Sequence, residues 1–126
     1  MLGGLLAAFA GAVDAATLFK ETAAKAGINI NVIQEAADSY WDAVWLKKPF
    51  CASYWNGRPT CDWMFTTAYA ADAAWNDTFW KNPRFNELLL AARSETNSDT
   101  RAKQYAEMQQ LVHDDGGLIN IVFNNY

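Results

Sequence analysis

The sequence has few charged side chains and no excess of basic ones. Charged residues make up 19% of the 126 residues, and ten Lys and Arg stand against fourteen Asp and Glu, which gives a net charge of −4. Nucleic acids and anionic membrane surfaces attract proteins through clustered Lys and Arg. This balance argues against nucleic acid and against an anionic membrane as binding partners.

Histidine and cysteine are also scarce. His113 is the one histidine, near the expected end of a helix, and the two cysteines are Cys51 and Cys61. The cysteines do not fit a zinc spacing, and placing one at the start of a strand and the other in a helix keeps them too far apart for a disulfide. The sequence contains no phosphate loop, nucleophile elbow or HExxH pattern. It therefore predicts no catalytic residue, no metal site and no cofactor.

Long apolar runs are missing as well. A transmembrane helix needs about 20 apolar residues, and no stretch of this sequence reaches that length. The segment 1–16 is apolar and rich in small residues, but no Lys or Arg precedes Lys20, so it lacks the basic region of a secretion signal. We expect this segment to belong to an alanine-rich helix, with no recognisable signal peptide and no membrane insertion.

Aromatic residues, in contrast, are abundant. Six Trp, five Tyr and seven Phe make up 14% of the chain, and hydrophobic residues make up 52%. This composition provides enough apolar surface for a folded core and argues against disorder. The length suits one domain or a piece of a larger one. Because we find no repeat, low-complexity tract or linker, the sequence predicts that residues 1–126 form a single unit.

Apolar spacing and turn residues divide the chain into alternating helices and strands. Helices are expected at 5–26, where Gly27 ends the helix, and at 39–48. Three more helices are expected to begin at capping residues. These caps are Thr60, Asn82 (followed by Pro83) and Ser98, whose helix ends at Gly116. Strands are expected at 28–33, 50–55 and 118–123, and an aromatic-rich loop at 70–81. Strands separated by helices predict an α/β fold with crossover connections.

The segment 54–60 is the strongest candidate for a ligand site. It lies where a predicted strand ends and a predicted helix begins, and ligands of open α/β sheets bind beyond the carboxyl ends of strands. Tyr54 and Trp55 offer stacking faces, and Arg58 offers a forked donor for a carboxylate or phosphate. The same pattern also fits two core aromatics and a solvated arginine, and the residues alone favour neither interpretation.

Several blocks, taken in order, resemble a known family. They are AFAGAVDAATLFKETAAKAGINI, ADSYWDAVWLKKPFCASYWNGRPTCDWMFTTAYA, AAWNDTFWKNPRFNELLLAAR and RAKQYAEMQQLVHDDGGLINIVF. Together they resemble the solute-binding proteins of ABC transporters, in the family that carries peptides, nickel chelates and opines. The resemblance covers nearly the whole chain after about Phe9 and depends on the co-occurrence of the blocks.

The resemblance implies a fragment of the second lobe of a two-lobed, non-catalytic receptor. Such a receptor is periplasmic or extracytoplasmic, binds a small molecule or peptide and delivers it to a transporter permease. The ligand-binding residues that it implies are Tyr54, Trp55, Asn56 and Arg58. Trp55 stands where peptide-binding relatives carry an acidic residue, which argues against dipeptide recognition and leaves opines, sugar-like compounds and acidic metabolites open.

Two other classes of protein remain as alternatives. A stand-alone carbohydrate-binding module would use the same aromatic residues to stack against sugar rings. An enzyme domain is disfavoured because the sequence offers no catalytic pair. The sequence does not identify the ligand.

Overall fold

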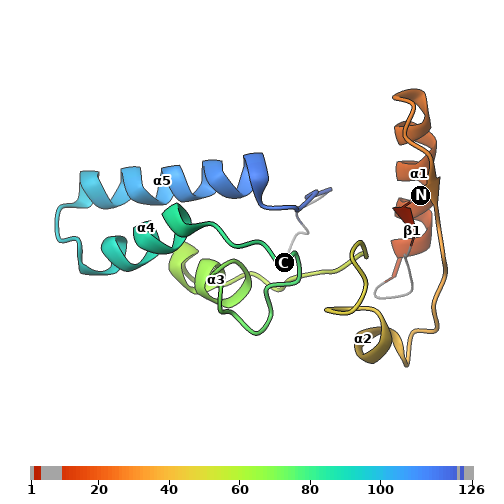
Figure 1. The fold of residues 1–126 in the computed structure, drawn as a ribbon, viewed down its shortest axis with the longest axis horizontal. Coiled ribbons are helices and arrows are strands. Elements are labelled where there is room, and N and C mark those ends of the chain that lie inside the picture. The colour runs from red at the N-terminus through yellow and green to blue at the C-terminus, as the bar shows by residue number, and fades with distance from the viewer. Residues whose placement is uncertain (1, 4–9, 122, 124–126) are drawn as a thin grey trace. The chain divides into compact units, whose positions relative to one another are not determined.

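The computed structural model describes residues 2–3, 10–121 and 123. They form two short strands and five helices (Figure 1): β1 (Leu2–Gly3), α1 (Ala12–Lys25), β2 (Ile30–Asn31), α2 (Tyr40–Ala43), α3 (Cys61–Ala68), α4 (Pro83–Ser94) and α5 (Ser98–Asp115). The chain forms two compact units, Met1–Asn56 and Gly57–Tyr126. We call them the first unit and the second unit.

The α/β prediction is wrong, because the described residues are mainly helical. Only Ile30–Asn31 of the predicted strand 28–33 is a strand, and it pairs in parallel with β1, Leu2 opposite Ile30. The predicted strand 50–55 has no strand residue, and neither do residues 118–121 and 123 of the last predicted strand. Residues 5–9 of the first predicted helix and residue 122 lie outside the described part. Strands are stable only with partners, and sequence periodicity does not supply partners.

Residues 50–52, at the start of the predicted strand 50–55, instead pack against the core of the first unit. Ala12 and Ala16 of α1 meet Tyr40 and Val44 there, and partly buried residues pack against them: Val13, Val32, Phe50, Cys51 and Ala52. The Tyr40 hydroxyl donates a 2.6 Å hydrogen bond to the Ala52 carbonyl. Residues 50–52 are therefore apolar because they pack on helices rather than in a sheet.

Glycine ends α1 as the sequence predicts. Gly27 has a φ of 78°, in the left-handed region, and the backbone N–H groups of Gly27 and Ile28 donate to the carbonyls of Ala24 and Ala23. These bonds satisfy carbonyl groups that would otherwise be unpaired at the helix end.

Side-chain caps begin all three helices of the second unit. Thr60 Oγ1 accepts from the backbone N–H of Trp63 at 3.2 Å, and Asn82 Oδ1 accepts from that of Phe85 at 3.0 Å, which confirms two predicted caps. The predicted Ser98 cap is wrong, because Asn97 has the extended backbone of a cap and its Oδ1 accepts from Thr100 N–H at 2.9 Å. Ser98 is already the first residue of α5.

Aromatic and aliphatic side chains fill the core of the second unit. Phe85 is fully buried, and its ring contacts Phe65 and Trp80 at centroid distances of 5.3 and 5.1 Å. The predicted stripe of α4 is confirmed, since Leu88, Leu89 and Ala92 are buried with Phe85. Helices α4 and α5 lie side by side (Figure 1), and Met108 of α5 is buried.

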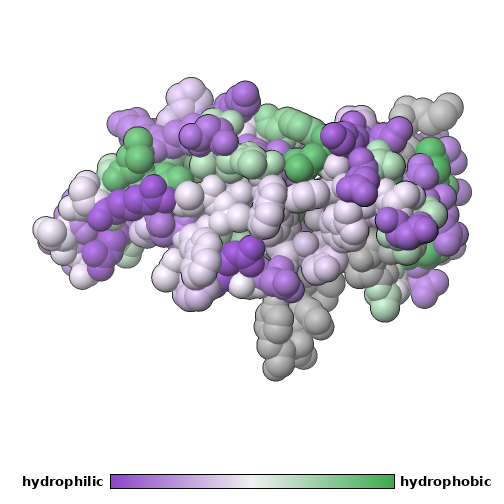
Figure 2. Space-filling model, turned by 90° about the horizontal axis from the view of Figure 1, so that it is seen from below, coloured by the Kyte–Doolittle hydropathy of each residue, from purple (hydrophilic) through white to green (hydrophobic). Residues whose placement is uncertain are grey.

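The surface mixes apolar and hydrophilic side chains. Figure 2 shows green apolar side chains among purple hydrophilic ones on the face seen from below. Among the described residues, no helix combines the length and the apolar character needed to cross a membrane.

Candidate functional site

Five aromatic residues of the first unit form a connected group, which we call the aromatic cluster: Tyr40, Trp41, Trp45, Tyr54 and Trp55. Trp41 is at its centre, with ring centroids 5.5 Å from Tyr40, 5.8 Å from Trp45 and 5.5 Å from Tyr54. Trp45 contacts Trp55 at 6.4 Å. The interplanar angles lie between 67° and 83°, the edge-to-face arrangement that aromatic pairs prefer.

A sharp turn after α2 builds the cluster. The chain turns through backbone hydrogen bonds from Lys47 and Lys48 to the Val44 carbonyl, and Leu46 has a φ of 58°. A branched residue in the left-handed region costs of order 1–3 kcal/mol and persists only where its surroundings impose it. The returning chain is then fixed by the bond from Tyr40 to Ala52, two residues before Tyr54.

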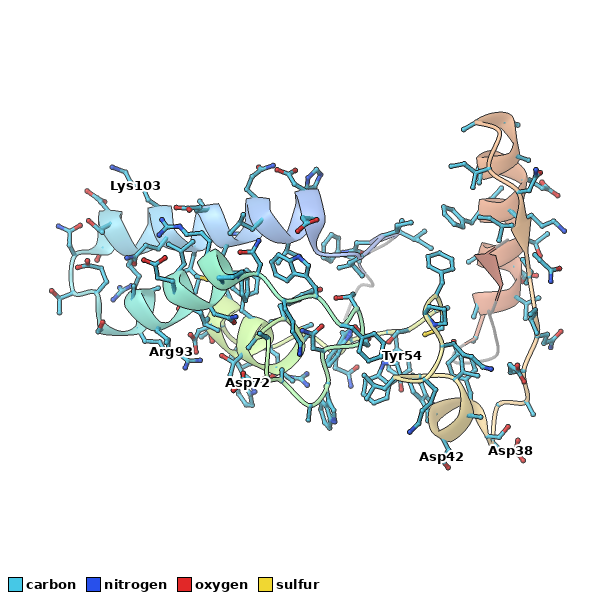
Figure 3. The ribbon with its side chains drawn as sticks, viewed as in Figure 1. Asp38, Asp42, Tyr54, Asp72, Arg93 and Lys103 are labelled. Atoms are coloured by element: carbon cyan, nitrogen blue, oxygen red, sulfur yellow. The ribbon has the colours of Figure 1, made fainter. Side chains whose placement is uncertain are left out.

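The cluster is anchored at one side and open at the other. Tyr40 is fully buried, whereas Trp41 is 37% exposed and Tyr54 is 52% exposed. Burial raises the pKa of Tyr40, and nearby Cys51 raises it further, so that its hydroxyl stays protonated and keeps donating to Ala52. Figure 3 shows Asp42 on α2, pointing away from Tyr54. The open side therefore exposes part of Trp41 and of Tyr54.

The structure distributes the four predicted site residues over both units. Tyr54 and Trp55 belong to the aromatic cluster, and the exposed Asn56 ends the first unit. Arg58 belongs to the second unit, where its guanidinium donates to the Gly57 carbonyl at 3.5 Å. The strand end on which the site was predicted is absent, because 50–55 is not a strand. The α3 N-terminus that follows is confirmed.

Trp41 and Trp45 lie in the predicted helix 39–48, outside the predicted site. Their four-residue spacing would put them on one face of that predicted helix, and this spacing is the available signal, but α2 ends at Ala43 and Trp45 follows it. What the spacing does not show is the turn at Leu46, which brings Tyr54 against Trp41.

Polar side chains of the second unit join its helices. Asp62 of α3 accepts from Arg93 Nε of α4 at 2.8 Å and from the Tyr105 hydroxyl of α5 at 3.2 Å. Arg93 also donates to Thr66. The hydrogen bond with Asp62 raises the pKa of Arg93, and burial followed by the charge of Asp62 raises the pKa of Tyr105. The raised pKa values keep Arg93 charged and Tyr105 neutral at neutral pH, which is typical of a structural network.

The described residues offer no other arrangement with evident chemistry. They contain no group of three or more His, Cys, Asp or Glu side chains that could hold a metal ion. His113 is exposed beside Asp114 at 2.8 Å. Asp114 has a lowered pKa because Gln110 and His113 hydrogen-bond to it. The aromatic cluster is thus the best candidate site, suited to stacking against a ring or planar group.

No protein-family model matches the chain, and no curated protein matches it.

Proposed function

We propose that the chain is a non-catalytic solute-binding component of an ABC transporter, acting as a piece of a larger extracytoplasmic receptor. The aromatic cluster forms one wall of its ligand site. The resemblance of the four sequence blocks to that family motivates the proposal. The observation that carries it is Trp41, whose ring is 37% exposed although three aromatic rings contact it.

A ring held in this way is prepared for binding. Edge contacts with Tyr40, Trp45 and Tyr54 restrict the rotation of Trp41, so a ligand that stacks on it pays little entropy for ordering the side chain. Tyr54 adds a second exposed face with a polar hydroxyl. Rigid aromatic residues of this kind supply contact area at low conformational cost. Peptides and opines carry the planar groups that such faces accept.

The permease partner and the extracytoplasmic location belong to the same proposal. One wall of a two-lobed site provides only part of the contact that a closed pocket gives a ligand. If the whole receptor binds at micromolar affinity, about 8 kcal/mol, the loss of a few of these leaves millimolar binding. This chain is therefore expected to bind weakly.

A stand-alone carbohydrate-binding module is the second candidate. The observation that favours it is the exposure of both Trp41 and Tyr54 on one cluster, since sugar rings stack on open aromatic faces. Such a module needs no second wall, so it predicts tighter binding by this chain than the receptor proposal does.

Nuclear magnetic resonance distinguishes the candidates, because it detects millimolar binding. The indole N–H signals of the chain are followed during titration with tripeptides, opines and oligosaccharides. Under the receptor proposal, peptides or opines shift the signals of Trp41 and Trp45 with dissociation constants of about 1 mM. Trp41→Ala and Tyr54→Ala each abolish the remaining shifts. Trp63→Ala is the matched control, an exposed tryptophan of α3 in the second unit, and leaves them unchanged.

Other outcomes contradict the receptor proposal. Saturable micromolar binding of an oligosaccharide, with no response to peptides or opines, establishes the carbohydrate module. Equal loss of binding in Trp41→Ala and Trp63→Ala removes the aromatic cluster from the site. No response to any of the three ligand classes overturns both candidates.

A further inference from the structure

The apolar segment that follows α5 is largely exposed. Leu118, Ile119 and Ile121 are 42%, 56% and 67% exposed, and Phe123 is 87% exposed. Residues 118–121 lie outside every helix and strand, and no hydrogen bond joins their backbone to another described residue. Folded proteins pair most of their backbone polar groups and expose few contiguous apolar side chains. This segment therefore offers both its backbone and its side chains to a partner.

The second unit holds the start of the segment in place. The indole N–H of Trp80 donates to Asp115, the last residue of α5, at 2.9 Å. Gly117 follows with a φ of 71°, and a Cβ added to it would lie 3.3 Å from the Cβ of Thr78. The segment thus leaves the second unit at a defined place, so a partner needs to order only a few residues.

The composition of this segment favours pairing with another chain as a strand. It combines apolar and β-branched residues and contains no proline, which is typical of strands that pair between molecules. Charged side chains commonly block such pairing at sheet edges, but residues 116–126 contain none. Two copies of a chain with a net charge of −4 can therefore meet at this segment without like charges opposite each other.

The order of the residues fits a second copy of the same segment. In an antiparallel pair with a two-fold axis at Asn120, Ile119 of each copy lies opposite Ile121 of the other. Each Asn120 then lies opposite its own counterpart, and one amide can both donate to and accept from another. Phe123 continues the face of the two isoleucines by the two-residue period of a strand. The segment is therefore complementary to itself.

We propose that residues 118–121 are a homodimerisation segment, in which two copies pair as antiparallel strands about Asn120. The pairing satisfies backbone N–H and C=O groups of both copies and buries isoleucine against isoleucine. A two-fold contact of this kind uses the same surface on both copies and closes at a dimer. The proposal does not depend on the proposed solute-binding function, because no residue of the aromatic cluster takes part.

Sedimentation equilibrium of the whole chain over a range of concentrations tests the proposal. We expect a reversible monomer–dimer equilibrium, with slower hydrogen exchange at residues 118–121 where the dimer is favoured. Ile119→Lys/Ile121→Lys places like charges opposite each other twice and should weaken dimerisation at least about tenfold. Leu90→Lys is the matched control, since Leu90 of α4 is also 67% exposed, and should leave dimerisation unchanged.

A variant with opposite charges identifies the antiparallel register. In Ile119→Lys/Ile121→Glu each introduced lysine lies opposite an introduced glutamate, so this dimer should be much tighter than that of the double-lysine variant. A parallel pair in register would instead place like charges opposite each other. The proposal is wrong if the whole chain stays monomeric up to about 1 mM, or if it forms open-ended aggregates. Equal weakening by Leu90→Lys, or by the two double variants, overturns it as well.

Discussion

The helices of the two units begin in different ways. In the second unit, Thr60, Asn82 and Asn97 each accept a hydrogen bond from the first turn of the helix that follows. In the first unit, Gly11 and Ser39 precede α1 and α2 without any side-chain cap bond. Helices of the second unit are thus specified largely by their own sequence, whereas those of the first depend more on packing.

The side-chain contacts that hold the two units together also differ. Asp62, Arg93 and Tyr105 link three helices of the second unit. The first unit relies on Tyr40 and the aromatic cluster, and it holds Leu46 in the left-handed region. Strained backbone and exposed aromatic residues are typical of binding sites, where local rules are broken for function. The second unit also holds Phe79 in the left-handed region and exposes Trp63 and Trp75. The connection of exposed rings around Trp41 is therefore what favours the first unit as the place of the candidate site.

The largest effect that we expect comes from the core of the second unit. Phe85→Ala removes a ring with 0% exposure that contacts Phe65 and Trp80, and such a cavity costs about 3–5 kcal/mol. Urea unfolding followed by helical circular dichroism measures this loss. Leu90→Ala, on the same helix but at 67% exposure, should change stability by less than about 0.5 kcal/mol.

Similar costs for Phe85→Ala and Leu90→Ala would contradict the assignment of the core. They would mean that α4 does not bury the face that contains Phe85, Leu88 and Leu89.

A smaller loss of stability is expected at alkaline pH, and it involves one buried tyrosine from each unit. Burial raises the pKa of Tyr69 to about 12, assisted by Asp77, and burial also raises the pKa of Tyr40. The unfolded chain loses these protons near pH 10, before the folded chain does, so stability is complete below pH 10 and falls above it. At about pH 11 each tyrosine should account for a loss of about 1 kcal/mol.

Phenylalanine variants assign this alkaline loss to the two units. Tyr40→Phe and Tyr69→Phe should each reduce the decrease in unfolding free energy between about pH 9 and pH 11 by about 1 kcal/mol. The double variant should remove both contributions, because the two tyrosines lie in different compact units. It should leave the contribution of Tyr105, whose pKa is also raised. If the single variants keep the full decrease, neither tyrosine is buried as described.

Sequence reasoning succeeded where the signal was local and failed where it needed a partner. Thr60, Asn82 and Gly27 were predicted as helix-end residues and are confirmed, because each bonds within a few residues of itself. The apolar segment 50–55 predicts a strand, but it contains no strand residue, and residues 50–52 pack against the core that contains Tyr40 and Val44. Trp41 could not be identified as the centre of the cluster without the turn at Leu46.

The smallest effect tests the caps themselves. Asn82→Ala removes the bond to the Phe85 N–H, and loss of such a cap costs typically about 1 kcal/mol. Ser39→Ala is the matched change in the first unit, where the Ser39 hydroxyl makes no cap bond and donates only to the Ala36 carbonyl at 3.4 Å. Urea unfolding should show the loss for Asn82→Ala and almost none for Ser39→Ala, and hydrogen exchange should place the loss in the first turn of α4. If both variants lose about 1 kcal/mol, α2 depends on its first turn as much as α4 does. The difference between the helices of the two units is then contradicted.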